Sequence, residues 1–225
     1  MKTVNVVIPA YNEEERIVAT LQAVKSIAGI DKIIVVNDGS KDATSEQARS
    51  QGVQVLDLSS NRGKGGAMNA ALPYLDADII VFLDADLGAS AVEAQKIIEP
   101  VKNGVADLCI AAFPPPSKKG GFGLVKGTAA WALRKAGQKE VNAPLSGQRA
   151  MTREVLQAVT PFHEAYGVEL GMSFRALLAG FRLMEVPTTM RHNETGRDLK
   201  GFLHRGRQFW DVVRVIYAET RGKGL

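Results

Sequence analysis

Short apolar runs alternate with segments of helical periodicity through the first half of the chain, and this alternation limits the fold more than any other feature. The run KIIVVN at residues 32–37 has almost no polar alternation, which is typical of a strand buried on both faces of a sheet. Comparable runs lie at residues 4–9, 53–58, 77–86 and 107–113. Strands that alternate with helices predict an α/β fold with a mainly parallel sheet.

The intervening segments repeat apolar residues every three or four positions, which predicts helices. In one of them, Ser90 and Glu93 have the spacing of a capping box and predict a helix start. The second half is less regular: residues 181–188 predict a strand, and the Pro- and Gly-rich stretch 114–123 predicts a mobile loop. The predicted helices cover residues 13–27, 41–50, 66–75, 90–99, 124–137, 153–159, 168–179 and 202–218.

The composition favours one soluble domain over residues 1–225, with 45% hydrophobic and 23% charged residues. A single cysteine, Cys109, excludes an internal disulfide and fits a reducing compartment. No apolar run approaches the roughly 18–20 residues that span a bilayer. The first apolar run is followed at once by acids, which indicates a strand and not a signal peptide. We therefore expect a cytoplasmic protein.

The net charge of +4 is concentrated near the C-terminus, because residues 191–225 hold eight Lys or Arg and four Asp or Glu. Such a segment favours contact with phosphate, a lipid headgroup or nucleic acid, and a solvated basic surface is the alternative. Residues 202–218 predict a basic helix whose apolar stripe either packs on the sheet, which we favour, or lies on an anionic membrane. Trp131 and Trp210 sit in apolar helix patterns and are predicted to pack.

The motif FLDADL places Asp84 and Asp86 directly after an apolar run. If the strand continues to this point, its alternation points both carboxylates to the same side, and the small Ala85 leaves room for a ligand. Carboxylate oxygens suit Mg²⁺ or Mn²⁺, which commonly binds phosphates alongside one or two carboxylates. The motif therefore predicts a metal-assisted diphosphate site, and a helix cap beside a solvated acid is the alternative.

Two further motifs follow predicted strands. In VVNDGSKDAT, Asp38 enters a turn. In NRGKGGAMNAAL, three glycines and Lys64 precede a helix, and such a helix start suits a diphosphate. This is not a P-loop. Each motif alone also fits a purely structural turn.

The four segments VVIPAYNEEERI, VVNDGSKDAT, NRGKGGAMNAAL and FLDADL occur in this order. They resemble the family 2-type glycosyltransferases of the GT-A fold, a Rossmann-like fold of nucleotide-diphospho-sugar transferases, over residues 4–112. The resemblance implies that residues 1–112 bind the nucleotide-sugar, with Asp38 on the base and Lys64 near the diphosphate. Asn37 departs from the acid that the family commonly has before DGS. The remaining implied donor-site residues are Pro9, Ala10, Tyr11, Glu13, Asp84, Ala85 and Asp86, with Asp86 as the preferred metal ligand.

Residues 113–225 resemble the acceptor half of glucosyl-3-phosphoglycerate synthases through PLSGQRAMTREVL, AYGVELGMSFRAL and VPTTMRHN. This resemblance implies that Glu169 lies beside the reacting groups and that His192 completes the metal site. It also implies that Ser146–Gln148 mark an acceptor loop, with Gly147 and Gln148 as its substrate-binding residues. From the residues alone, an acid that favours a helix N-terminus is the alternative for Glu169, but YGVELG places an acid where an ordinary helix needs none, which favours a functional role. His192 is equally a solvated histidine. Arg197 in the basic segment is predicted to contact phosphate.

The sequence thus predicts a glycosyltransferase that moves a sugar from a UDP- or GDP-linked donor to an unidentified acceptor, which could carry a phosphate. We expect Mg²⁺ or Mn²⁺ and Lys64 to stabilise the leaving diphosphate, and Glu169 to position or deprotonate the acceptor hydroxyl. Asp86 and Glu169 are the expected catalytic residues.

Three alternatives stay open. The first is a polyprenyl-phosphate glycosyltransferase at the membrane surface. A nucleotidyltransferase would have a glycine-rich loop after the first strand, but PAYNEEE has no glycine. A nucleic-acid-binding module leaves the acidic pair unexplained, so no nucleic-acid partner is expected. The sugar, the base, the acceptor, a homodimer and peripheral membrane contact are also open. The family 2 resemblance favours inversion, and the synthase resemblance favours retention.

Overall fold

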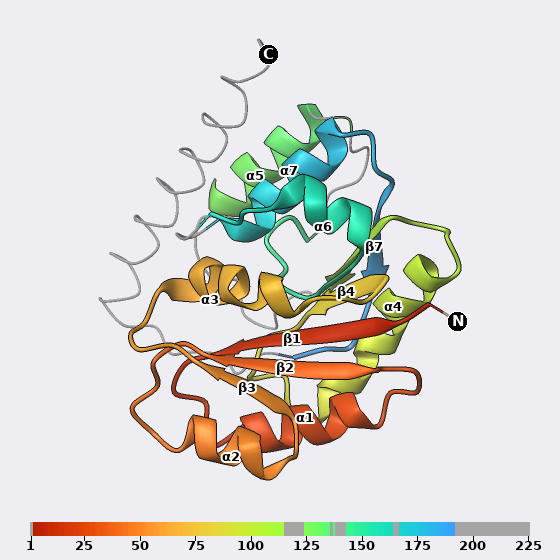
Figure 1. The fold of residues 1–225 in the computed structure, drawn as a ribbon. Coiled ribbons are helices and arrows are strands. Elements are labelled where there is room, and N and C mark those ends of the chain that lie inside the picture. The colour runs from red at the N-terminus through yellow and green to blue at the C-terminus, as the bar shows by residue number, and fades with distance from the viewer. Residues whose placement is uncertain (1, 115–123, 136, 138–142, 164–166, 192–225) are drawn as a thin grey trace.

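The computed structural model describes residues 2–114, 124–135, 137, 143–163 and 167–191. Within these residues a seven-stranded sheet has the order β3-β2-β1-β4-β6-β5-β7 (Figure 1). The strands are β1 Val4–Ala10, β2 Lys32–Asn37, β3 Gln54–Asp57, β4 Ile79–Phe82, β5 Leu108–Ala112, β6 Arg149–Thr152 and β7 Leu183–Pro187.

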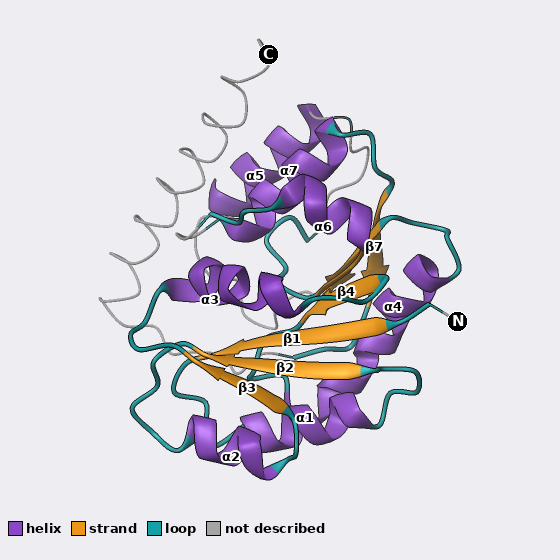
Figure 2. Ribbon diagram, in the orientation of Figure 1, coloured by secondary structure: helices purple, strands orange, loops and turns teal. Residues whose placement is uncertain are grey.

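Helices cover both faces of the sheet (Figure 2). Helices α1, α2 and α4 lie on one face, and α3, α6 and α7 lie on the other, with α5 beside α7. The helices are α1 Ile17–Lys25, α2 Thr44–Ser50, α3 Gly63–Ala71, α4 Gln95–Lys102, α5 Leu124–Lys135, α6 Arg153–Val159 and α7 Val168–Leu178, with 3-10 helices η1 Leu72–Tyr74 and η2 Gly88–Ala94. No helix among the described residues has both the length and the hydropathy to cross a bilayer.

The continuous apolarity of the central strands follows from this two-sided cover. In β1, Val6 and Ile8 face the core beneath α1, whereas Val7 faces the core beneath α3, and all three are fully buried. All four residues of β4 are fully buried as well. Burial of each such side chain stabilises the fold by about 1.5–3 kcal/mol.

The register of the parallel strands brings their carboxyl ends to one edge of the sheet. Strand β1 pairs parallel with both β2 and β4, with Ala10 opposite Asn37 and Val7 opposite Phe82. The loop after β2 is tied to β1 by the Asp38 N–H, which donates to the Ala10 carbonyl at 2.8 Å. Ligands of such sheets bind at this edge, and three of the four sequence motifs lie in loops that follow these strands.

The sequence analysis missed β6, which runs antiparallel between β4 and β5. Its four residues RAMT begin with a charge, and Arg149 pairs with Ile110 in the middle of the sheet. A charged residue in a four-residue segment gives no strand pattern, and here its burial depends on hydrogen bonds that the sequence does not show. The sheet is mainly parallel, as predicted, but not entirely so.

Four local predictions were wrong. Strand β4 ends at Phe82, so Asp84 and Asp86 lie in a loop and strand alternation does not orient them. Ser90 and Glu93 form no capping box: the Ser90 hydroxyl donates to the Leu87 carbonyl, and residues 88–94 form η2 instead of the start of an α-helix. Helix α1 begins only at residue 17, and α3 begins already at residue 63. Most of the predicted loop 114–123 and the predicted helix 202–218 lie outside the described residues.

Gly65 in α3 allows this helix to pack directly on the segment that precedes α7. A Cβ at Gly65 would lie 1.8 Å from the His163 carbonyl oxygen. We expect Gly65→Ala to lower the free energy of unfolding by about 1–3 kcal/mol through overpacking, although alanine favours a helix. The measurement is equilibrium urea unfolding.

The matched control is Gly127→Ala in α5, where a Cβ would have no atom within 4 Å. This variant should gain roughly 0.5–1 kcal/mol from helix propensity. Equal stability of the two variants would contradict the packing of α3 described here.

Candidate functional site

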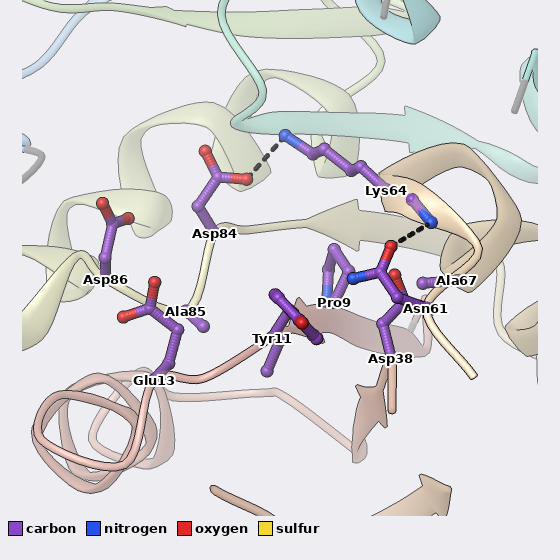
Figure 3. A pocket seen from close by; sticks show the side chains of 12 residues that line it. Pro9, Tyr11, Glu13, Asp38, Asn61, Lys64, Ala67, Asp84, Ala85 and Asp86 are labelled. Carbon is purple, nitrogen blue, oxygen red and sulfur yellow. Dashed lines mark hydrogen bonds and ion pairs between the residues drawn. The ribbon is translucent and has the colours of Figure 1, made fainter. Parts of the chain in front are cut away.

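A cavity of about 290 Å³ opens at the sheet edge where β1, β2 and β4 end (Figure 3). Its walls come from the loops that follow these strands and from the first turns of α3. The lining residues are Pro9, Ala10, Tyr11, Glu13, Asp38, Asn61, Gly63, Lys64, Ala67, Asp84, Ala85 and Asp86. All nine residues predicted for the donor site are among them. The roles assigned to these residues stay predictions, but the structure does bring them together.

The loops after β1 and β2 hold each other in place. Asn12 has a left-handed backbone with φ of 55°, which turns the chain after β1. Its side-chain oxygen accepts from the Lys41 N–H at 2.9 Å, and its own N–H donates to the Ser40 hydroxyl at 3.0 Å. These bonds fix Tyr11 and Glu13 at the cavity wall.

Asp38 is a buried carboxylate held by a backbone amide. Only 4% of the residue is exposed, and it accepts from the Arg62 N–H at 2.7 Å. Burial raises the pKa of Asp38, and the N–H groups of Arg62 and Gly63 partly oppose this rise. The following Gly39 has φ of 72°, and a Cβ there would lie 2.8 Å from the Ser60 backbone. The glycine of the DGS motif is therefore required for the close approach of these two loops.

Lys64 joins the two halves of the chain. Its Nζ lies 2.6 Å from Asp84 Oδ1 and 2.9 Å from Glu169 Oε1, and Figure 3 shows the first of these pairs. Burial acts to lower the pKa of Lys64, but the negative charges of Asp84 and Glu169 outweigh it and raise the pKa above its ordinary value. The ammonium group is thus held in its charged form at the cavity wall.

The predicted acceptor loop meets the same cluster. Gln148 donates to Asp84 Oδ2 at 2.7 Å and accepts from the Asp84 N–H at 2.9 Å. A Cβ on Gly147 would lie 2.2 Å from Lys64 Nζ, so a side chain at this position would displace the ammonium group. Gly147, Gln148 and Glu169 from the second half therefore meet Lys64 and Asp84 from the first.

Asp86 and Glu13 form an acidic wall on the other side of the cavity. Burial raises the pKa of Glu13, the negative charge of Asp86 raises it further, and Arg16 opposes both. Within the described residues, no three His, Cys, Asp or Glu side chains converge as a metal site by themselves. One or two carboxylates with phosphate oxygens are nevertheless a usual ligand set for Mg²⁺, so the residues present fit a cation that binds together with a diphosphate.

A buried arginine that the sequence analysis did not single out lies behind this cluster. Arg149 is fully buried, and it donates from Nε to the Ser146 carbonyl at 2.9 Å and from Nη1 to the Ser173 hydroxyl at 2.7 Å. The Ser173 hydroxyl in turn donates to the Glu169 carbonyl at 3.0 Å. Burial lowers the pKa of Arg149 to about 10, although Glu169 and Glu185 oppose the shift. Asn61, Gly63 and Ala67 were also not singled out, although they belong to the NRGKGGAMNAAL motif.

Two predicted site residues, His192 and Arg197, lie outside the described residues, as does Trp210. The last described residues run beside η2: the Thr189 N–H donates to Glu93 at 3.0 Å, and the Arg191 N–H donates to Ser90 at 3.1 Å. Trp131, which was predicted to pack, is 54% exposed.

The raised pKa of Asp38 predicts that the charged carboxylate lowers the stability of the fold in a pH-dependent way. The folded state binds a proton at Asp38 more tightly than the unfolded chain, so the free energy of unfolding falls as the pH rises from about 3.8 through the raised pKa. Asp38→Asn removes this charge and keeps an acceptor for Arg62. Its stability relative to the native chain should rise over that pH window and stay higher at neutral pH, as measured by urea unfolding.

Asp57→Asn is the control of opposite sign. Hydrogen bonds from Ser45, Asn37 and Arg49 lower the pKa of Asp57, so its charge stabilises the fold at neutral pH and the benefit disappears in acid. If the stability of both variants relative to the native chain changed with pH in the same direction, Asp38 would not be a buried carboxylate with a raised pKa.

Comparisons with known proteins show the family and the fold of the chain. Residues 5–156 match the model of Glycosyl transferase family 2. The chain is 33% identical over 192 residues to glucosyl-3-phosphoglycerate synthase of Mycolicibacterium smegmatis, which covers 76% of this chain and 63% of that protein. It is 27% identical over 206 residues to undecaprenyl-phosphate mannosyltransferase of Micrococcus luteus, which covers 84% of each. The chain spans 63% of the length of the first two curated relatives.

The structure is similar to the crystal structure of glucosyl-3-phosphoglycerate synthase from Mycobacterium tuberculosis in complex with Mn²⁺, uridine diphosphate and phosphoglyceric acid. The TM-score is 0.80 at 25% identity, with 97% of this chain and 78% of that chain covered. The complex of the same enzyme with Mg²⁺ and uridine diphosphate gives a TM-score of 0.79 at 26% identity, with 97% and 79% covered. Since the family model covers more than half of the residues, the chain belongs to glycosyl transferase family 2, and its fold is the GT-A fold of these structures.

Proposed function

We propose that this protein transfers a sugar from a UDP-linked donor, with Mg²⁺ or Mn²⁺, to a small phosphorylated acceptor. The observation that carries the proposal is the cluster around Lys64. The Lys64 ammonium group, on the side of the cavity proposed for the sugar donor, contacts both Asp84 and Glu169. The solved relatives support the choice of uridine diphosphate and of these cations, because one holds Mn²⁺, uridine diphosphate and phosphoglyceric acid, and another holds Mg²⁺ and uridine diphosphate.

The nucleotide would occupy the cavity between the loops after β1 and β2. Tyr11 is 43% exposed, so its ring is available to a flat base, and the buried Asp38 would accept a hydrogen bond from that base. The diphosphate would then lie at the first turn of α3, where backbone N–H groups and the helix dipole favour negative charge.

Lys64 has a donor to spare for the diphosphate. An ammonium group has three N–H donors, and Asp84 and Glu169 accept two of them. A third remains for a phosphate oxygen, so Lys64 can contact the leaving group without leaving its two carboxylates. A fixed positive charge at this point would stabilise the charge that develops as the glycosyl bond breaks.

Asp86, helped by His192, would hold the divalent cation against the diphosphate. When bound, the cation would neutralise negative charge on the leaving nucleoside diphosphate. Glu13 on the same wall would add to the negative potential that attracts the cation.

Glu169 would hold the acceptor hydroxyl. Its side chain is fixed by Lys64, and its backbone carbonyl accepts from Ser173, so the carboxylate is oriented before substrate arrives. Gly147 and Gln148 would form the floor of the acceptor side, and Arg197 would contact the acceptor phosphate. Residues 1–225 would act as one domain, with residues 1–112 for the donor and 113–225 for the acceptor.

The activity test is release of uridine diphosphate and transfer of the sugar from UDP-glucose, with Mn²⁺ present or chelated. We expect metal-dependent transfer to phosphoglyceric acid or glycerol 3-phosphate, and a loss of at least 100-fold (about 2.7 kcal/mol) in Asp86→Asn. The matched control is Glu46→Gln, which makes the same carboxylate-to-amide change at an exposed position of α2 and should retain full activity.

The acceptor class is tested in the same assay. Undecaprenyl phosphate in vesicles replaces the small phosphorylated acceptor, with vesicle sedimentation to detect membrane contact. Transfer to the lipid alone would overturn the proposed acceptor and favour the membrane-surface alternative. Metal-independent activity, or full activity of Asp86→Asn, would overturn the proposed metal site.

Gly147→Ala tests the contact between the acceptor loop and Lys64. The added Cβ would lie 2.2 Å from Lys64 Nζ and 3.0 Å from Asp84 Oδ2. Because the Lys64 side chain can move, we expect the fold to be kept but the affinity for uridine diphosphate to fall by about tenfold, or 1.4 kcal/mol. Isothermal titration measures this affinity, and Gly127→Ala is the control. An unchanged affinity would show that the position of Lys64 does not matter for the diphosphate.

A further inference from the structure

Thr20 is a polar residue in an otherwise apolar helix face. It lies on α1 and is fully buried, on the same helix as the buried residues Ile17, Leu21 and Val24. A buried hydroxyl is costly unless it is hydrogen-bonded. Valine has nearly the same shape and would avoid that cost, so the hydroxyl of Thr20 needs an explanation.

The hydroxyl spans the turn that carries Asp86. Thr20 Oγ1 donates to the Ala85 carbonyl at 2.7 Å and accepts from the Gly88 N–H at 2.8 Å. One side-chain oxygen thus bonds the residue before Asp86 and the residue two positions after it. Residues 85 and 86 form a turn, and Gly88, with φ of 54°, begins η2, so this segment is not an extension of β4.

The sheet itself does not hold this turn. Strand β4 ends at Phe82, and the Leu83 N–H makes the next backbone bond, to Val7 of β1 at 3.1 Å. Asp84 is then held by Gln148 and Lys64. Gly88 is the first residue of η2, so no earlier carbonyl of that helix can accept a hydrogen bond from its N–H. Between residues 85 and 88, the hydrogen bonds of Thr20 therefore hold the backbone that strand pairing no longer holds.

The surrounding packing keeps Thr20 in place. Helix α1 packs against η2, and Ala85, Leu87 and Ala91 share one core cluster with the apolar residues of α1. Side chains in such a close-packed core have little freedom to move. The hydroxyl is therefore a fixed point against which the turn is positioned.

We propose that Thr20 is a positioning residue that presents Asp86 to the cavity and thereby sets the affinity for a divalent cation bound with a nucleoside diphosphate. The inference rests on the proposed function and adds to it a residue that lies outside the cavity lining. Residues that orient metal ligands commonly change metal affinity by 10–100-fold when they are removed.

The test compares Thr20→Val, which removes both hydrogen bonds at nearly constant shape, with Thr20→Ser, which keeps the hydroxyl. The affinity for uridine diphosphate is measured without metal, in the presence of a chelator. The affinity for Mn²⁺ is measured at saturating uridine diphosphate. We expect Thr20→Val to weaken Mn²⁺ binding by about tenfold or more, with metal-free nucleotide affinity unchanged, and Thr20→Ser to retain most of the native Mn²⁺ affinity.

Thr152→Val controls for a general loss of stability. Thr152 is the N-cap of α6, where its hydroxyl accepts from the Val155 N–H, and it lies beside Ile79 at the other end of β4. This variant should be destabilised but should bind Mn²⁺ as the native chain does. If Thr20→Val does not fold, Thr20→Ala is compared with Thr20→Ser, since the two differ by the hydroxyl alone.

The outcomes separate this inference from the proposed function. A native chain whose nucleotide binding does not respond to metal would overturn the metal site and this inference together. A native chain that responds to metal, with Thr20→Val binding Mn²⁺ equally well, would overturn the role of Thr20 alone. Equal weakening in Thr152→Val would also overturn it, because the effect would then reflect stability only.

Discussion

The parallel register of β1 with β2 and β4 is the constraint on which the rest of the structure depends. It places the ends of three strands side by side, so that groups far apart in the sequence, such as Glu13, Asp38 and Asp86, share one cavity. Each strand is buried on both faces, and a slip of one residue would exchange the two sets of core side chains. The hydrophobic core therefore fixes the position of polar groups that contribute nothing to it.

Charge balance is the second requirement of this edge. Four carboxylates, Glu13, Asp38, Asp84 and Asp86, line the cavity, and Lys64 is the ammonium group among its lining residues. Burial raises the pKa of both Glu13 and Asp38, and for Glu13 the negative charge of Asp86 adds to the rise. Such a cluster is unfavourable for the fold by itself and becomes favourable when positive charge is added. Lys64 pairs with Asp84, and the acidic wall of Glu13 and Asp86 is suited to a cation.

The sequence allowed much of this arrangement to be predicted, and the failures have physical causes. Unbroken apolar runs predicted β1 and β2, and the family resemblance of the four ordered motifs implied that their residues share one donor site. Strand β6 escaped prediction since Arg149 is buried through hydrogen bonds to atoms that only the folded chain brings near. The turn at Asp86 was predicted as strand, because the local sequence pattern cannot show that a hydrogen bond from Thr20, and not a neighbouring strand, holds the backbone there. Long-range polar contacts leave no periodic signal.

The reversed direction of β6 has a consequence for how such enzymes diversify. Because this strand runs against β4, the segment that enters it lies at the same edge as the segment that leaves β4, and Gly147 and Gln148 reach Asp84 by that route. Changes just upstream of residue 146 can therefore reshape this side of the cavity while the pairing of β4 with β1 stays intact. With the donor and acceptor sides as proposed above, recognition of new acceptors can evolve in this architecture without disturbing the residues proposed to hold the donor.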